Sequence, residues 1–234
     1  NSAGNDGSGD WNFIGAPADA DSVLAVGGLL PSSGIHTAFS SVGPTYDFRQ
    51  KPNVTAYGYV IAAKKDNVSE TQGTSFSSPL TAGFAACAWQ ANRSWTNMEL
   101  FHELEKGSDL YPYCDYAHGY GVPQASYFLD KAEEVSPTIT LEKFESEIKV
   151  TIMSPSLIIR EDQTQLEMSL NSSVNCVSDY EDYLFYQFQT EDGIIMSYKV
   201  IDIQGAEIYS FTYPSKAEKA VVYYEGYTIE MRLK

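Results

Sequence analysis

The segment of residues 73–79 (GTSFSSP) stands directly before a long apolar stretch, and this arrangement constrains the fold more than any other feature of the chain. The stretch predicts a helix from about Ser75 to Asn92, with Pro79 in its first turns, where a missing backbone N–H is tolerated. Apolar residues return to one face of this helix at helical spacing, so we expect that face to be buried. The face consists of Phe76, Leu80, Phe84 and Ala88.

The start of the predicted helix favours chemistry at Ser75. A side chain in the first turn lies beside unpaired backbone N–H groups and the positive end of the helix dipole, which favour negative charge on an attacked carbonyl oxygen. The alternative is that Thr74 or Ser75 only caps the helix.

Residues 1–136 combine this helix with glycine-rich loops and short apolar runs such as Ser22–Gly27, a mixture typical of α/β folds. A second helix is predicted over Asn97–Lys106, where apolar residues form a stripe among acidic ones. Cys87 lies in a run of small and apolar residues, which favours a buried structural thiol over a reactive one.

From Pro137 onward, apolar and polar residues alternate with period two, which is typical of strands. Turn signals such as Asp192-Gly193, Gln204-Gly205 and Glu225-Gly226 recur among these runs, at intervals of roughly ten residues. We therefore predict two domains, residues 1–136 and residues 137–234, the second an all-β antiparallel sandwich. Its predicted strands include Glu147–Ile152, Gln165–Leu170, Tyr183–Gln189, Ile194–Ile201, Glu207–Phe211, Ala220–Tyr224 and Tyr227–Leu233.

The second domain is rich in tyrosine, which leaves two interpretations open. Alternating strand tyrosines pack a sandwich in most cases, and we favour that role in a stabilising or substrate-presenting accessory domain. An aromatic face that binds carbohydrate or peptide is the alternative.

Several segments of the first domain occur in an order that resembles a known family. They are residues 2–5 (SAGN), 39–44 (FSSVGP), 47–54 (DFRQKPNV) and 73–79 (GTSFSSP), with further support from 22–28 and 119–122. The set is similar to the C-terminal half of the catalytic domain of subtilases, the subtilisin-like serine proteases, over residues 1 to 128. The resemblance implies that residues 1–136 are part of an α/β subtilisin-like domain, with helices around a mostly parallel sheet.

The resemblance also implies roles for individual residues. Ser75 would be the nucleophile that attacks a peptide carbonyl, and the Asn5 side chain with the Ser75 backbone N–H would hold the resulting oxyanion. Ser2, Ala3 and Gly4 would form one wall of the pocket for the substrate residue before the scissile bond. The implied substrate is a polypeptide.

Subtilases carry their triad in the order aspartate, histidine, serine, so both partners of Ser75 are expected before Asn1. His118 follows the serine, and His36 and His102 are no better placed as the catalytic base. We therefore expect the chain to be a fragment that is inactive alone, with the missing N-terminal half of the catalytic domain as its partner. The alternative is a non-catalytic pseudopeptidase or a surface binding module.

The formal net charge of −16 argues against partners with phosphate backbones or anionic lipid surfaces. No apolar run approaches the roughly 18 residues that a membrane span needs. The family resemblance implies a secreted, cell-surface or periplasmic location. It also admits calcium, for which the sequence offers no clustered acidic ligands, so we assign no metal ligand and no other cofactor.

Overall fold

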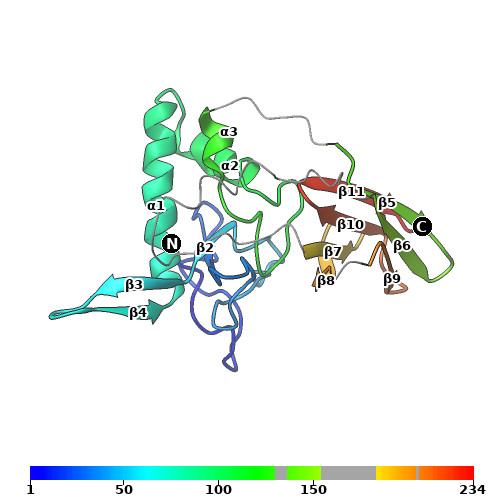
Figure 1. Ribbon diagram of the computed structural model, residues 1–234, viewed down its shortest axis with the longest axis horizontal. Helices are drawn as coiled ribbons and strands as arrows, with labels where there is room; N and C mark the ends of the chain where they lie inside the picture. Colours follow the sequence, from blue (N-terminus) through cyan, green and yellow to red (C-terminus); the bar gives the residue numbers. More distant parts are fainter. Residues whose placement is uncertain (130–135, 154–182, 204–205) are drawn as a thin grey trace, which may run out of the picture.

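The computed structural model describes residues 1–129, 136–153, 183–203 and 206–234. The helices and the first strands belong to the N-terminal part, and the strands from Ile139 onward lie together in a separate body of sheets (Figure 1).

A short parallel sheet forms the centre of the N-terminal part. Strand β1 (Val26–Leu29) pairs in parallel with β2 (Val54–Tyr57), and Ser2 forms a parallel bridge to Val26 on the other side of β1. Both strands are buried or nearly so, as expected for a sheet covered by a helix. The β1–β2 pair and the Ser2–Val26 bridge are both parallel, as a mostly parallel sheet requires. The full extent of that sheet stays a prediction.

Helix α1 (Thr74–Ala91) packs on β1 and β2 and matches the predicted helix to within one residue at each end. The prediction of its buried face was wrong. Apart from Ala88, the buried residues are Thr74, Ser77 and Thr81, whereas Leu80 is 49% exposed. Apolar residues are spread around the helix and not gathered on one face, so periodicity could not identify the face that meets the sheet, and small side chains allow the closest approach to the strands.

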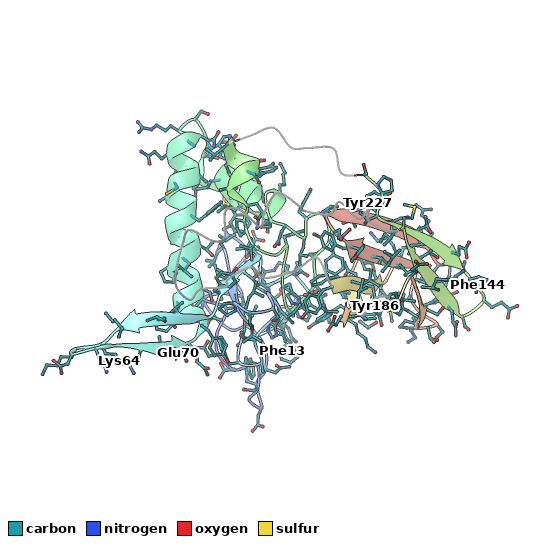
Figure 2. The ribbon with its side chains drawn as sticks, in the orientation of Figure 1. Phe13, Lys64, Glu70, Phe144, Tyr186 and Tyr227 are labelled. Atoms are coloured by element: carbon teal, nitrogen blue, oxygen red, sulfur yellow. The ribbon has the colours of Figure 1, made fainter. Side chains whose placement is uncertain are left out.

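The remaining elements of this part lie around α1. Strands β3 (Tyr59–Ala63) and β4 (Val68–Gln72) form a hairpin that projects beside the start of α1, with Lys64 on it (Figure 2). This hairpin was not predicted from the sequence. Helix α2 (Asn97–Lys106) has the predicted bounds, and α3 (Ala125–Leu129) is a short helix. Cys87 is exposed on α1, so its predicted burial was also wrong.

Two antiparallel sheets make up the described C-terminal part. One contains β5 (Ile139–Lys143), β6 (Glu147–Ile152) and β9 (Ile208–Thr212). The other has the order β11-β10-β7-β8, with β7 (Tyr183–Gln189), β8 (Ile195–Asp202), β10 (Lys219–Tyr224) and β11 (Tyr227–Arg232). One hydrophobic cluster draws on both sheets and includes Ile148, Leu184 and Tyr186, the last labelled in Figure 2. A sandwich and the domain boundary after residue 136 remain predictions.

Most predicted strands match observed ones to within one or two residues, and β5 was missed. The predicted strand Gln165–Leu170 and the turn Gln204-Gly205 lie outside the described residues. At the turn between β10 and β11, Glu225 and Gly226 have φ values of 45° and 79°, the positive pair that a tight hairpin requires. None of the described tyrosines of this part is among the exposed large hydrophobic residues, which favours the packing interpretation over a binding face.

The two parts meet through a buried aromatic cluster. Strands β7 and β10 are buried on both faces: alternate residues enter the cluster between the two sheets, and the others face the N-terminal part. Tyr113 of the N-terminal part contacts Phe185 of β7 and Tyr223 of β10, with ring centroids 5.8 and 6.1 Å away. Tyr113 and Phe185 are each 0% exposed, so this contact is part of the protein core.

Candidate active site

The Asn5 side chain is fixed by the residue that precedes Ser75. Asn5 Oδ1 accepts hydrogen bonds from the backbone N–H and the hydroxyl of Thr74, each at 2.9 Å. An amide oxygen accepts and an amide nitrogen only donates, so these bonds set the orientation of the Asn5 amide and leave Nδ2 available as a donor. Thr74 therefore brings the predicted oxyanion donor beside the predicted nucleophile.

Ser75 lies in the first turn of α1 with an exposed side chain. The alternative that Thr74 or Ser75 only caps the helix is wrong, because the N-cap residue is Gly73, which has no side chain to make a cap hydrogen bond. The Ser75 N–H has no hydrogen-bond acceptor within the described part of the chain. The first turn also lacks acidic side chains, so the positive end of the helix dipole is not offset there.

Gly73 lies where the two predicted donors meet. Its φ of 141° falls in the range that favours glycine. A methyl group added at Gly73 would lie 3.4 Å from Asn5 Nδ2, 3.7 Å from Asn5 Oδ1 and 3.8 Å from Ser75 N. Both nitrogens therefore border the same small volume.

The loop of residues 4–7, here called the Asn5 loop, is bound on its other side by residues 39–41. A methyl group at Gly4, where φ is 113°, would come within 2.7 Å of Ser41 Oγ, so the two segments are in close contact. Hydrogen bonds to main-chain atoms of the Asn5 loop fix its position. They join Ser41 N–H to Gly4 O (3.0 Å), Asp6 N–H to Ser41 Oγ (3.1 Å) and Gly7 N–H to Phe39 O (2.9 Å).

Ser2, Ala3 and Gly4, the predicted pocket wall, run alongside β1 and lead into the Asn5 loop. Ala3 N–H donates to Val26 O at 2.9 Å, and Ala3 itself is 2% exposed. The Gly4 N–H lies 3.3 Å from the hydroxyl of Thr74. Hydrogen bonds thus hold this segment next to the two donors, and its part in substrate binding stays a prediction.

The three histidines, His36, His102 and His118, form hydrogen bonds or ion pairs with residues other than Ser75. His118 is buried and bonded to Asp115, with Nδ1 3.0 Å from Oδ2. His36 hydrogen bonds to Ser40 O through Nε2 at 2.9 Å, and burial together with the nearby His118 lowers the pKa of His36 to about 4. His102 is exposed and pairs with Glu105. None of the three forms a hydrogen bond with Ser75.

Within the described ranges, no group of three or more His, Cys, Asp or Glu side chains is arranged to hold a metal ion. In the same ranges, no helix combines the length and apolar character that crossing a membrane requires.

Sequence reasoning gave no role to two residues that shape this site. Thr74 was considered only as a cap, although its place between Gly73 and Ser75 in the motif could have pointed to a second function. Ser41 lies in the matched segment 39–44, but its contact with the Asn5 loop joins residues far apart in the sequence.

Comparisons with known proteins concern mainly the N-terminal half. A family model described as "Subtilase family" matches residues 1–121. Subtilisin NAT from Bacillus subtilis subsp. natto is 35% identical over 104 residues, which are 44% of this chain and 26% of that protein. The halolysin-like extracellular serine protease Nep of Natrialba magadii is 33% identical over 120 residues, 51% of this chain and 20% of that protein.

The chain thus spans about a quarter and a fifth of the length of these two relatives. The solved structure of Sphericase is 26% identical, with a TM-score of 0.44 over 53% of this chain and 46% of that one. The family model covers more than half of the chain and includes every segment of the predicted resemblance that runs from Ser2 to Pro79. The chain therefore belongs to the subtilase family of serine proteases.

Proposed function

We propose that this chain carries the nucleophile and the oxyanion-binding groups of a serine endopeptidase, with Ser75 as nucleophile and Asn5 as oxyanion donor. The observation that supports this most is the shared volume beside Gly73, which both Asn5 Nδ2 and Ser75 N border. Two donor nitrogens that border one such volume suit the single oxygen on which negative charge develops during acyl transfer.

In the proposed reaction, Ser75 Oγ attacks the carbonyl carbon of a peptide bond, and its proton passes to a histidine base. The carbonyl oxygen becomes an oxyanion that accepts hydrogen bonds from Asn5 Nδ2 and Ser75 N–H. When the C–N bond breaks, the histidine returns the proton to the leaving amine and an acyl-enzyme on Ser75 remains. Water then hydrolyses the ester, and the segment Ser2–Gly4 holds the substrate residue before the scissile bond.

The histidine and the aspartate that orients it are proposed to precede Asn1, as the family's chain order implies. Without them the Ser75 hydroxyl is a weak nucleophile, so the chain by itself is proposed to be inactive. Large apolar side chains exposed on α1 support a covering partner, since Leu80 and Trp89 are 49% and 42% exposed. The N-terminal half of the catalytic domain is the proposed cover.

The proposed substrate is a polypeptide, and the proposed location is outside the cell, as the name of the relative Nep states for that protein. The reaction as written uses no cofactor. Calcium remains an expectation from the family, with no ligands assigned.

Labelling with a fluorophosphonate tests the proposal, because this reagent forms a stable adduct only with an activated serine. We expect the full-length protein that contains this chain to gain one adduct, located by peptide mass mapping at Ser75. Ser75→Ala is expected to abolish both labelling and peptide cleavage. Ser78→Ala, one turn further along α1, is the matched control and is expected to retain both.

Residues 1–234 expressed alone are expected to remain unlabelled. If the full-length, folded protein also remains unlabelled, the protease proposal is wrong and the non-catalytic pseudopeptidase becomes the better interpretation. An adduct on a serine other than Ser75 would contradict the assigned nucleophile.

A further inference from the structure

The segment that binds the Asn5 loop is itself anchored at a buried histidine. Residues 36–41, here called the clamp loop, begin at His36, whose backbone N–H donates to His118 Nε2 at 3.1 Å. The His36 ring closes the loop on itself by donating to Ser40 O. At the far end, Phe39 and Ser41 make the bonds to the Asn5 loop.

The clamp loop has little freedom at its contact with the Asn5 loop. A methyl group at Gly7 would lie 2.3 Å from Ser40 O and 2.7 Å from Ala38 O, which is far inside van der Waals contact. Ser40 is 0% exposed, and its hydroxyl accepts from Gly28 N–H at 3.0 Å. A displacement of the clamp loop is therefore passed to the Asn5 loop.

The hydrogen-bond partners of His118 select one tautomer of its ring. Its Nε2 accepts from a backbone N–H and so carries no proton, which leaves Nδ1–H to donate to Asp115. Asp115 is 0% exposed and also accepts from Ala117 N–H and His118 N–H, at 2.8 and 2.6 Å. A carboxylate with this many donors holds the imidazole in one tautomer and one orientation.

The C-terminal sheet packs against the ring of His118. The Phe185 ring of β7 meets the His118 ring edge to face, with centroids 5.4 Å apart and an interplanar angle of 88°. Phe185 is held in turn by Tyr223 of β10 and by Tyr113, whose hydroxyl donates to Asp115 at 3.2 Å. His118 thus contacts both Phe185 of the C-terminal sheet and the backbone of His36, where the clamp loop begins.

We propose that His118 is a positioning residue for the oxyanion donor Asn5, acting through the clamp loop, and that Phe185 of the C-terminal sheet holds His118 in place. The C-terminal strands then contribute to catalysis through packing and not through contact with substrate. This inference rests on the proposed protease function.

The first test compares two variants of His118 in the full-length protein, with peptide-cleavage rates divided by the concentration of sites titrated with fluorophosphonate. His118→Phe keeps a ring but loses the acceptor for His36 N–H, and we expect kcat to fall about 10- to 100-fold with little change in KM, since a misplacement near 1 Å can cost about 10²-fold. His118→Gln can still offer an oxygen to His36 N–H and is expected to recover most of that loss.

The second test asks whether His118 acts through Asn5. If it does, adding His118→Phe to Asn5→Ala lowers kcat no further, because the donor that His118 positions is already absent. A loss in the double variant equal to the product of the two single losses would overturn the proposal.

The third test concerns the C-terminal sheet. Phe185→Leu is expected to lower kcat per titrated site several-fold, whereas Phe188→Leu on the same strand is expected to leave it unchanged. Phe188 is 2% exposed and faces the cluster between the two sheets, so it is a control of similar burial on the opposite face. Equal effects of the two variants, or an effect on the titrated fraction alone, would show that Phe185 only stabilises the fold.

The outcomes separate this inference from the proposed function. An unlabelled wild-type protein contradicts the protease function itself. A labelled and active wild-type protein whose kcat is unchanged by His118→Phe contradicts only the positioning role.

Discussion

At the scale of single residues, Thr74 organises the site. Its hydroxyl lies 2.9 Å from Asn5 Oδ1 and 3.2 Å from Gly4 O, and its N–H takes the second lone pair of Asn5 Oδ1. The motif segments predict Asn5 and Ser75 as a pair, because each lies in a short pattern that resembles one of the family's motifs. The contact between Asn5 and Thr74, the neighbour of Ser75, spans 69 positions of the sequence, and no local pattern encodes it.

Thr74→Val removes the hydroxyl and keeps the shape of the side chain. Asn5 retains only the bond from the Thr74 N–H, so its amide is less restrained, and we expect kcat to fall about 10-fold, the equivalent of one hydrogen bond of about 1 to 1.5 kcal/mol. Thr74→Ser keeps the hydroxyl and is expected to stay within about twofold of the wild type. Equal kcat values for the two variants, measured per titrated site, would contradict the restraint assigned to this hydroxyl.

The buried carboxyl group of Asp109 makes the stability of the fold depend on pH. Burial raises its pKa to about 6, although the backbone N–H groups of Val122 and Leu110 partly offset this. A carboxyl group whose pKa is higher in the folded state stabilises the fold below its unfolded pKa of about 3.9, and this contribution is lost as the pH rises through 6.

Asp109→Asn keeps an oxygen for the Val122 N–H and removes the charge. We therefore expect the variant to be more stable than the wild type at pH 7, by roughly 2 to 3 kcal/mol, with the difference shrinking towards pH 4. The pKa of His36 is shifted in the opposite direction, down to about 4. Its neutral ring therefore stabilises the fold above pH 6.5, and this stabilisation is lost as the pH falls through 4. Denaturant unfolding at pH 4 and pH 7 measures the difference, and a variant less stable at pH 7 would contradict the buried, charged state of Asp109.

At the scale of elements, helix bounds were predictable because local signals mark them. Thr96 and Glu99 form a capping box at the start of α2, and the predicted range Asn97–Lys106 is the observed one. The buried face of α1 was not predictable, because its apolar residues are spread around the helix and the residues that meet the sheet are mainly small hydroxyl-bearing ones. The β3–β4 hairpin was missed because β3 (YVIAA) is apolar throughout and β4 (VSETQ) is mostly polar, so neither strand shows the alternation that marks a half-buried strand.

The capping box of α2 is expected to make a measurable contribution to the free energy of unfolding. Thr96 Oγ1 accepts from Glu99 N–H at 3.2 Å, and Glu99 accepts from Thr96 N–H at 2.6 Å. We expect Thr96→Ala to lower the free energy of unfolding by about 1 kcal/mol and Thr96→Ser to leave it nearly unchanged, because serine caps as well as threonine. The midpoints of urea unfolding curves provide the comparison, and identical midpoints for the alanine and serine variants would contradict the assigned cap.

At the scale of the whole molecule, the C-terminal strands are joined to the N-terminal part by core packing. The alternation of residues after Pro137 predicted strands but not their partners, since a period of two shows that a face is buried and not what covers it. In β7 a nearly continuous apolar run, Tyr183–Gln189, was the available sign that both faces are covered. The covering residues, Leu110 and Tyr113, lie in an irregular segment for which periodicity makes no prediction.

The central claim is that Asn5 and Ser75 act on one substrate oxygen. The structure of the full-length protein after reaction with a fluorophosphonate tests it most directly, because the phosphoryl oxygen of the adduct takes the place of the oxyanion. We predict an adduct on Ser75 Oγ with the phosphoryl oxygen about 3 Å from both Asn5 Nδ2 and Ser75 N. An adduct whose phosphoryl oxygen is bound by other donors, with Asn5 turned away, would contradict the account.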